Sequence, residues 1–359
     1  MKKVTMQHIA DHLGVSKFVV SKALSGKSGV NEATKDRVIQ AASQLGYFAQ
    51  KNAYMKNRSL PRSALTASGP TRQSVIVLMP NTRFQTKESL YWGKILEGID
   101  RDLESRGIGM MTISESRAED LSHILNPEGI LGLIGVGRIE SALLLEVHRL
   151  GIPMVLVDHE DALIPTDTVF ANNADSIMRL CQHLIGLGHE KLHFIGDISF
   201  SRSFRDRWLG YREAMEENGL EVPGTDDPML QPAGLEIGKY TPFIQEWVQD
   251  RIKDNTLPTA LICANDAIAL NVLEALRQAG VEVPNQVSVA GFDNIDHVLQ
   301  TSPPLTTIHV PKEAMGQRAV RKLMERIEYP DQIREKVLVA AELVLRESTR
   351  ETRKSKPAE

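Results

Sequence analysis

Between residues 74 and 345, short apolar runs of strand length alternate with longer segments whose apolar residues recur at helical spacing. This alternation is typical of parallel sheets covered by helices on both faces, in which the strands are apolar throughout. The expected strands are 74–80, 108–114, 129–136, 153–158, 191–196, 260–264, 287–292 and 335–345. The expected helices are 88–106, 119–125, 140–150, 174–187, 208–218, 239–255, 267–279 and 312–326. The pattern predicts an α/β fold for most of the chain.

The alternation comes in two consecutive sets, which predicts two subdomains. The first set ends at a crossover near residues 170–173, and the extended stretch 303–308 later leads into the last helix and strand. We therefore expect an N-subdomain of about 74–171 plus 309–333 and a C-subdomain of about 172–304 plus 335–346. The charged end, residues 347–359, is expected to be disordered.

The first 48 residues have the spacing of a small all-α domain with three helices. Thr5 can cap a first helix that ends at Gly14, Ser16 can cap a second, and Asn31 can cap a third that stops at Gly46. The inward apolar positions are Met6, Ile9, Ala10, Leu13, Val19, Val20, Ala23, Leu24, Val38, Ala41, Ala42 and Leu45. A small residue at position 10 and a glycine at position 14 permit the close packing of a helix-turn-helix.

The outward surface of the second helix distinguishes a DNA-binding domain from an ordinary three-helix bundle, whose apolar faces would look similar. Its residues are Lys17, Phe18, Ser21, Lys22 and Ser25. Lysine and serine suit phosphates and base edges, whereas an exposed Phe18 is costly on a face that only meets solvent. These residues favour DNA binding.

The same stretch resembles the N-terminal signature of the LacI/GalR family of bacterial transcription regulators. The matching residues are Val4-Thr5, Ile9-Ala10, Gly14-Val15-Ser16, residues 20–25, Val30, Thr34 and Leu45-Gly46-Tyr47. The resemblance implies that the helix starting at Lys17 lies in the major groove. The implied contacts are Lys17, Phe18 and Lys22 with bases, Ser16, Ser21, Asn31 and Thr34 with phosphates, and Thr5 and Ala53 as further DNA-binding positions.

Several positions depart from the family pattern, among them Ala49-Gln50, which stand where the family usually has a Pro-Asn pair. Val19 stands where the family usually has Thr, and Lys22 stands where it usually has Arg, so a point charge replaces a bidentate fork. Residues 49–73 form a hinge or linker rich in Ser, Pro, Arg and Asn, and Lys56 occupies the position of the Leu that usually enters the minor groove. We expect residues 50–56 to form a helix on operator DNA that bends it less than in relatives.

The net charge of −4 argues against DNA binding until its distribution is considered. The first 62 residues hold eleven Lys and Arg against three Asp and Glu, a net charge of +8, which leaves −12 for the remainder. A basic head on an acidic body suits a protein that touches DNA with one end only. The chain is expected to be cytoplasmic, because it has no apolar leader and no apolar run of membrane length. It is expected to need no metal or cofactor, because it has no zinc pattern and because Cys181 and Cys263 lie in apolar stretches.

The body resembles the type I periplasmic-binding-protein-like fold that the family joins to its DNA-binding domain. The matching segments are 186–192, 207–211, 264–269, 287–294 and 304–308. The resemblance implies an effector site between two subdomains. Because no leucine heptads follow Arg346, we expect a homodimer rather than a tetramer.

Polar residues follow several expected strands, at the edge where open parallel sheets bind ligands. They are Asn81, Asp158, Asn265 and Asp293, with Arg207 opening a helix nearby. A single residue of this kind is more often a turn or cap residue than a ligand contact. The resemblance assigns effector contacts to Asp158, Arg207 and Asp293 and adds Ser203, Asn265 and Leu230. Carboxylates that accept hydroxyl hydrogens, together with a guanidinium fork, favour a sugar or sugar acid.

These features predict a transcription regulator of the LacI/GalR type, a repressor whose affinity for operator DNA is controlled by a small metabolite that acts as inducer or co-repressor. An enzyme is disfavoured because Gly135-Val136-Gly137 lacks the third glycine of a dinucleotide fingerprint, and no P-loop or nucleophile elbow occurs. A periplasmic sugar-binding protein is disfavoured by the basic helical head. Control by a protein co-repressor, rather than by a pocket ligand, stays open.

Overall fold

The computed structural model describes residues 5–24, 34, 37, 38, 41, 74–80, 89–114, 130–231 and 240–352. The chain divides into two compact units, Met1–Pro70 and Thr71–Glu359. Several predictions lie outside the described residues. They concern Asn31, Ala53, Asn81, the hinge helix 50–56 and the helix 119–125.

The first unit contains the two helices of the predicted helix-turn-helix, α1 (Met6–Leu13) and α2 (Lys17–Leu24). Thr5 caps α1, since its side chain accepts from the N–H of His8 at 3.4 Å and its own N–H donates to the His8 ring at 3.1 Å. Gly14 ends α1 at φ +67°, a left-handed conformation that favours glycine. Ser16 Oγ then accepts from the N–H of Val19 at 3.3 Å and caps α2.

The core of this unit is small and uses the predicted positions. Ile9, Ala10 and Val20 are buried together with Val38 and Ala41 from the segment that follows. Because Ala10 presents only a methyl group, α1 and α2 can pack closely at the turn.

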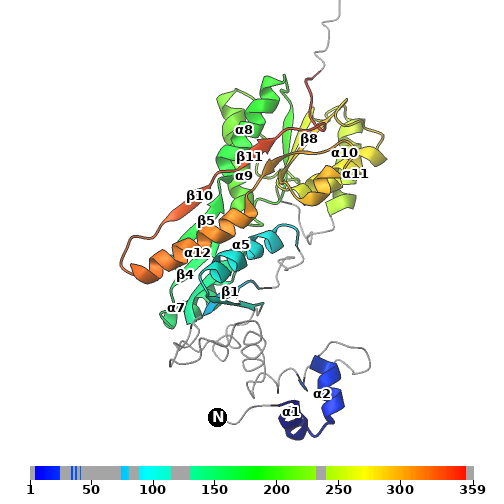
Figure 1. Ribbon diagram of the computed structural model, residues 1–359. Helices are drawn as coiled ribbons and strands as arrows, with labels where there is room; N and C mark the ends of the chain where they lie inside the picture. The colour runs from blue at the N-terminus through cyan, green and yellow to red at the C-terminus, as the bar shows by residue number, and fades with distance from the viewer. Residues whose placement is uncertain are drawn as a thin grey trace, which may run out of the picture. The chain divides into compact units, whose positions relative to one another are not determined.

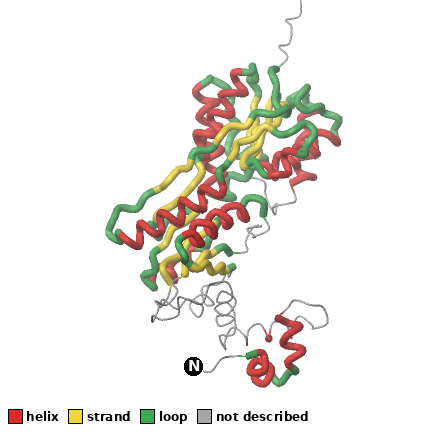
Figure 2. Tube along the Cα trace, in the orientation of Figure 1, coloured by secondary structure: helices red, strands yellow, loops and turns green. Residues whose placement is uncertain are grey.

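The second unit is built on two sheets, which are visible at its two ends in Figures 1 and 2. The first sheet is parallel, with the strand order β10-β5-β4-β3-β1-β2. Its strands are β1 (Ser74–Leu78), β2 (Gly109–Ile113), β3 (Ile130–Val136), β4 (Met154–Val157), β5 (Asp167–Ala171) and β10 (Lys336–Val339). The second sheet has the order β11-β9-β8-β7-β6, and β11 is antiparallel to β9. Its strands are β6 (Leu192–Ile195), β7 (Ala260–Cys263), β8 (Ser288–Asp293), β9 (Thr306–His309) and β11 (Glu342–Val344).

Helices cover the first sheet on both faces, which explains why its strands are apolar throughout. On β1, Val75 and Val77 pack into the same core as α5, whereas Ile76 and Leu78 pack into the core that contains Leu143 of α7. The described residues of this first subdomain form the helices α5 (Trp92–Ser105), α7 (Ser141–Arg149) and α12 (Lys312–Glu328). Helix α12 packs against α5 and against the strands β3, β4 and β5.

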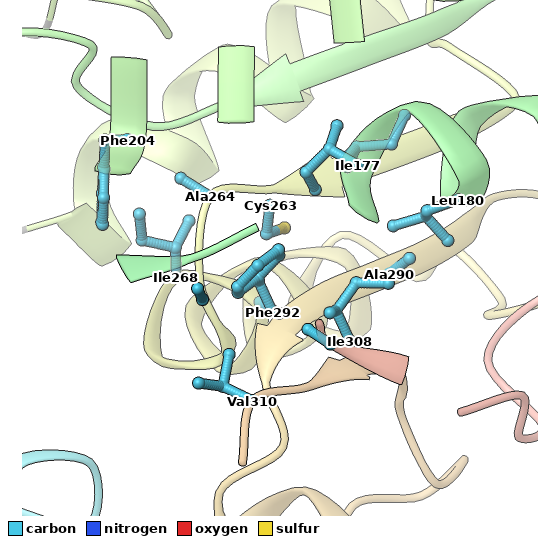
Figure 3. Packing of buried hydrophobic residues seen from close by; sticks show 14 of the residues in the cluster. Ile177, Leu180, Phe204, Cys263, Ala264, Ile268, Ala290, Phe292, Ile308 and Val310 are labelled. Atoms are coloured by element: carbon cyan, nitrogen blue, oxygen red, sulfur yellow. The ribbon is translucent and has the colours of Figure 1, made fainter. Parts of the chain in front are cut away.

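The second sheet carries the remaining helices and forms the second subdomain. They are α8 (Asn173–Gly186), α9 (Arg202–Glu217), α10 (Tyr240–Lys253), α11 (Asp266–Gln278) and the 3₁₀ turn η1 (Asp296–Leu299). Figure 3 shows its core, in which Cys263, Phe292 and Ile308 of the sheet lie near Ile177 and Leu180 of α8. Cys181 and Cys263 are both fully buried, as their apolar surroundings predicted.

Two pairs of helices touch at glycine residues. A Cβ on Gly98 of α5 would lie 2.0 Å from the carbonyl oxygen of Glu313, and one on Gly316 of α12 would lie 2.2 Å from that of Ile95. A Cβ on Gly210 of α9 would similarly lie 2.1 Å from the carbonyl oxygen of Ala174 in α8. These distances are far inside van der Waals contact, so both helix pairs require glycine at the crossing.

The prediction of one strand over 335–345 is wrong. The structure divides this stretch into β10, which pairs with β5 in the first sheet, and β11, which pairs with β9 in the second. Residues 336–339 therefore belong to the first subdomain, whereas the sequence had suggested the second. The chain passes between sheets at Ala340 and Ala341, where Arg179 Nη2 donates to the Ala341 carbonyl at 2.9 Å.

The prediction of disorder from residue 347 onward is also wrong for residues 347–352. Ser348 is fully buried, and its hydroxyl donates to the Val289 carbonyl at 2.6 Å while accepting from the N–H of Thr306 at 2.7 Å. Thr352 N–H donates to the Leu187 carbonyl at 3.0 Å. The charged composition of this segment suggested disorder. The segment is ordered because its Ser and Thr residues form hydrogen bonds with main-chain groups of the second subdomain.

Two further segments differ from the sequence prediction. The predicted crossover near 170–173 overlaps the end of the buried strand β5, which the sequence analysis did not predict. Helix α9 begins at Arg202 rather than at Trp208, because Ser201 caps it with a 3.2 Å bond from the N–H of Phe204. Within the described ranges, no helix is both long and apolar enough to span a membrane. The same ranges contain no group of His, Cys, Asp and Glu that could hold a metal ion.

Candidate functional site

In the first unit, α2 presents cationic and aromatic side chains to solvent. Lys17, Phe18 and Ser21 are exposed, and Phe18 is 68% exposed. The ammonium of Lys22 lies 5.2 Å from the centroid of the Phe18 ring. Thr34 is half-buried within a helical segment. The exposure of this helix face agrees with the sequence analysis, and such a face is able to contact phosphates and base edges.

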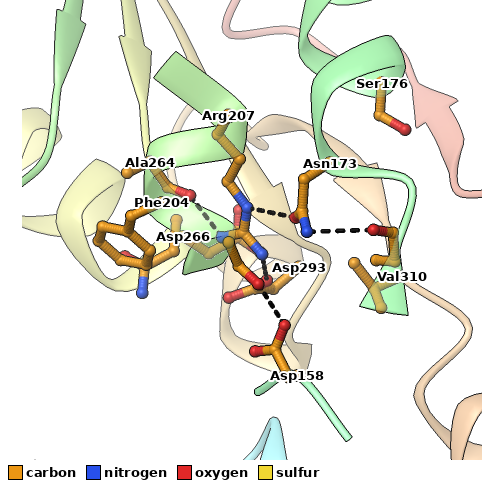
Figure 4. Close-up of polar contacts among 12 residues, drawn as sticks. Asp158, Asn173, Ser176, Phe204, Arg207, Ala264, Asp266, Asp293 and Val310 are labelled. Carbon is orange, nitrogen blue, oxygen red and sulfur yellow. Dashed lines mark hydrogen bonds and ion pairs between the residues drawn. The ribbon is translucent and has the colours of Figure 1, made fainter. Parts of the chain in front are cut away.

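In the second unit, Arg207 joins three elements at the carboxyl edge of the second sheet. Its side chain is buried on α9, where Nε donates to Asn173 Oδ1 at 2.8 Å and Nη1 donates to the Ala264 carbonyl at 2.6 Å (Figure 4). Nη2 lies 3.4 Å from Asp293 Oδ1. The guanidinium carbon is 3.7 Å from the centroid of the Phe292 ring. Arg207 is therefore held firmly between the starts of helices and the ends of strands.

Asp293, at the end of β8, is a buried carboxyl group that is only partly satisfied. Oδ1 has no hydrogen-bond partner among the described residues, apart from the ion pair with Arg207. Burial raises the pKa of Asp293 to about 7, although Arg207 and Lys312 oppose this increase. Such a group can accept a hydrogen bond from a ligand hydroxyl when ionised and donate one when protonated.

Asp158 brings the first subdomain to the same cluster. It follows β4 in a left-handed conformation (φ +55°), and its Oδ1 accepts from the hydroxyl of Ser203 on α9. Burial raises the pKa of Asp158, whereas Arg207 and the Ser203 hydrogen bond lower it. Two residues further along the loop, Glu160 forms an ion pair with Arg202 of α9. These contacts cross between the two subdomains.

Tyr91, immediately before α5, is a member of the cluster that the sequence analysis missed. Its hydroxyl is buried without a hydrogen-bond partner among the described residues. Burial raises the pKa of Tyr91 well above its usual value, and the carboxyl groups of Asp158 and Asp293 raise it further, so the hydroxyl lies within their electrostatic reach. Tyr91 does not directly follow a strand, and the only signal was a polar aromatic residue at the start of an expected helix.

Two other predicted positions, Asn265 and Leu230, have structural roles. Asn265 Oδ1 accepts from the N–H of Ile268 at 2.9 Å and caps α11, which is the alternative role that was considered for it. Leu230 is buried in the core, and its carbonyl accepts from the N–H of Ile198 at 3.0 Å. Among the described positions, the structure brings together Asp158, Ser203, Arg207 and Asp293.

The pKa of Asp293 predicts a specific pH dependence of stability. Its folded value of about 7 lies above the ordinary 3.8. A raised value means that this group's contribution is complete below pH 3.8 and is lost as pH rises through 7. We expect Asp293 to reduce the free energy of unfolding by roughly 1 kcal/mol between pH 6 and pH 8. Denaturant unfolding at both pH values should reveal this loss.

The matched variant for this measurement is Asp293→Asn, which cannot titrate and should show a flatter dependence. The groups that act on the Asp293 carboxyl are Arg207 of α9, Asp266 of α11, Lys312 of α12, and Asp158. Asp266, whose pKa burial raises to about 6, contributes a smaller loss at lower pH. Equal slopes in the wild type and Asp293→Asn would refute the assignment to Asp293.

Comparisons with known proteins agree for both units. The model of the bacterial regulatory proteins of the lacI family matches residues 5–50, and the model of the periplasmic binding protein-like domain matches residues 181–349. The HTH-type transcriptional regulator GalR of Lacticaseibacillus casei is 28% identical over 351 residues, which cover 96% of this chain and 99% of that protein.

Two solved structures have the same fold. A complex of the transcriptional regulator CelR with cellobiose has a TM-score of 0.66 at 22% identity, covering 96% of this chain and 99% of the other. The lac repressor dimer bound to operator and the anti-inducer ONPF has a TM-score of 0.64 at 22% identity, covering 97% of this chain and all (100%) of the other.

Proposed function

Because this chain belongs to the LacI/GalR family of DNA-binding transcription regulators, we propose that it is a repressor whose operator affinity is controlled by a sugar bound at the Arg207 cluster. We define the Arg207 cluster as Tyr91, Asp158, Ser203, Arg207 and Asp293. The relatives are named as transcription regulators, and the protein is a regulator rather than an enzyme.

The observation that carries the effector proposal is the convergence of both subdomains on a buried group with unfilled hydrogen-bonding positions. Asp158 and Tyr91 come from the first subdomain, whereas Ser203, Arg207 and Asp293 come from the second. A ligand that bridges them would have a different affinity for open and closed arrangements, which is the requirement for control of DNA binding. The cellobiose complex of CelR supports a sugar.

The DNA contacts in this proposal follow the exposed surface of α2. Lys17, Phe18 and Lys22 would reach bases, and Ser16 and Ser21 would hold phosphates. The further proposed contacts are Thr5, Asn31, Thr34 and Ala53. The lac repressor dimer bound to operator supports a homodimer that binds operator DNA. In this proposal the operator is roughly palindromic and the protein acts in the cytoplasm.

The effector proposal is tested by thermal unfolding of the full-length protein with a panel of neutral sugars, including cellobiose and ribose, and with sugar acids. A sugar that binds the folded body raises Tm with concentration, by an amount equivalent to about 2.7 kcal/mol at a hundredfold excess over Kd. The same sugar should change the affinity for duplexes recovered from genomic DNA by the purified protein. If no sugar binds and a protein partner instead changes the affinity for these duplexes, control by a protein co-repressor would replace this proposal.

Substitution of Lys17 or Lys22 by Ala should weaken binding to those duplexes by roughly 10- to 100-fold, because each removes a cation from the DNA surface. If the lysine meets a phosphate, the slope of log affinity against log salt should also fall by about 0.9. Fluorescence anisotropy over a salt series measures both quantities. Lys253→Ala, an exposed lysine on α10 of the second unit, is the control and should change neither. An unchanged affinity in both α2 variants would exclude this surface as the DNA contact.

A further inference from the structure

Lys312 is a buried cation at an electrostatically unfavourable position. It is the first residue of α12 and is 5% exposed. The N-terminus of a helix carries the positive end of its dipole, so a cation is disfavoured there. Burial lowers the pKa of Lys312, although Asp293 opposes this decrease. A lysine at this position therefore needs compensating contacts.

Those contacts are backbone carbonyl groups on both sides of a connection between the subdomains. Lys312 Nζ donates to the Asp293 carbonyl at 2.6 Å and to those of Asn294 and Val310 at 3.3 Å each. Asp293 ends β8 in the second subdomain and Asn294 follows it, whereas Val310 lies between β9 and α12. Because α12 packs on the first sheet, the ammonium group links the first subdomain to the backbone of Asp293.

The backbone that Lys312 contacts is strained. Asp293 has φ +111° and Asn294 has φ +52°, values that residues other than glycine rarely adopt. Such a conformation persists only where the surroundings fix it. Ile295 N–H donates to Asp266 Oδ2 at 2.9 Å, and Arg346 Nη2 donates to Asn294 Oδ1 at 2.7 Å. Among the groups that contact residues 293–295 here, Lys312 comes from α12, which belongs to the first subdomain.

We propose that Lys312 is a positioning residue for the effector site, which fixes the backbone of Asp293 so that its carboxyl faces Arg207. Arg207 contacts the side chain of Asp293, and Lys312 contacts its main chain. A change in the angle between the subdomains would act on Asp293 through Lys312. The role in effector response rests on the proposed function, whereas the positioning itself does not.

The first test is hydrogen exchange of the full-length protein without effector. Lys312→Met keeps the apolar stem and removes the three donated hydrogen bonds. We expect exchange in residues 293–296 to become roughly 10- to 100-fold faster, because a lost hydrogen bond to a charged group loosens this loop. Exchange in β7 should change far less than exchange in this loop, and Tm should fall only by the few degrees that the lost hydrogen bonds account for. Lys312→Arg, which keeps a cationic donor, should restore part of the protection.

The control is Lys94→Met on α5. This substitution also removes one positive charge near the start of α12, because Lys94 Nζ lies 3.6 Å from Glu313. Lys94 pairs with Glu97 and Glu313 rather than with residues 293–294. Its loop exchange should equal that of the wild type. Unchanged exchange in Lys312→Met would overturn the proposal. A Lys312→Met protein that exchanges faster throughout, or that unfolds as a whole, would assign Lys312 to general stability and overturn it equally.

The second test is the pH profile of stability. A residue that only packs against its neighbours would not change the pH at which Asp293 titrates. Because Lys312 opposes the raised pKa of Asp293, Lys312→Met should move the Asp293 titration to higher pH, and Lys94→Met should not. The other groups that act on this carboxyl are Arg207, Asp266 and Asp158. An unmoved profile would contradict the proposal. Both tests need no effector, so failure of the sugar panel would leave them interpretable.

Discussion

Replacement of Arg207 by Met is expected to abolish the response to the effector and to lower the free energy of unfolding by about 3–5 kcal/mol at pH 8. The guanidinium holds Asn173, the Ala264 carbonyl and Asp293 together while lying on the Phe292 ring. Without it, Asp293 is a buried carboxylate that no longer has a cation paired with its side chain, and of the described cations only Lys312 still acts on it. The sequence alone assigned Arg207 only to the effector, and the structure adds this contribution to stability.

The loss should be smaller at pH 6, because Asp293 is then mostly protonated and needs less compensation. Denaturant unfolding at the two pH values measures the difference. Arg212→Met on the same helix is the matched control. Its side chain is 45% exposed and pairs with Glu216, so its removal should change stability by about 0–1 kcal/mol. If Arg207→Met had wild-type stability at pH 8, the buried ion pair would have no energetic role.

Replacement of Gly98 by Val is expected to destabilise the second unit by about 3 kcal/mol or more, at the upper end of the overpacking range. The first added carbon would already lie 2.0 Å from the carbonyl oxygen of Glu313, which belongs to the backbone and cannot rotate away. Helix α5 would have to separate from α12, and the apolar core between them would lose contact. Tm and denaturant midpoint should both fall.

The matched control is another helical glycine, Gly186 at the end of α8. A Cβ there meets no atom within 4 Å. Gly186→Ala should therefore be neutral or stabilise by about 0.5–1 kcal/mol through lower entropy of the unfolded chain. The two glycines cannot be distinguished by sequence position alone, since both lie in predicted helices. Equal effects of Gly98→Val and Gly186→Ala would mean that the α5 and α12 crossing tolerates separation.

Much of the fold follows from local patterns. The continuous apolar runs predicted buried parallel strands, since a strand covered on both faces excludes polar residues. Thr5, Gly14 and Ser16 predicted the boundaries of the first two helices, because caps and left-handed glycine act within one turn of the chain. The predictions failed at 335–345 and 347–352, where strand pairing and Ser348 contacts depend on residues far away in the chain.

The candidate site divides in the same way. The sequence showed that polar residues follow several strands, and this pattern identified Asp158 and Asp293. It gave no reason to choose Tyr91 or Lys312, whose significance comes from burial beside those carboxyl groups. Nor could it separate Asn265, which caps α11, from its neighbours at the same sheet edge.

The sequence by itself determined most of the helices and strands, and that one basic end suits DNA whereas the acidic body does not. Those properties depend on interactions within a few residues or on net charge. Only the tertiary structure decided that Arg207 is held by Asp293, that Asp158 meets Ser203 across the subdomains, and that Lys312 grips the Asp293 backbone. Such contacts join residues 19–86 positions apart, and their formation depends on strand order and crossovers rather than on local preference.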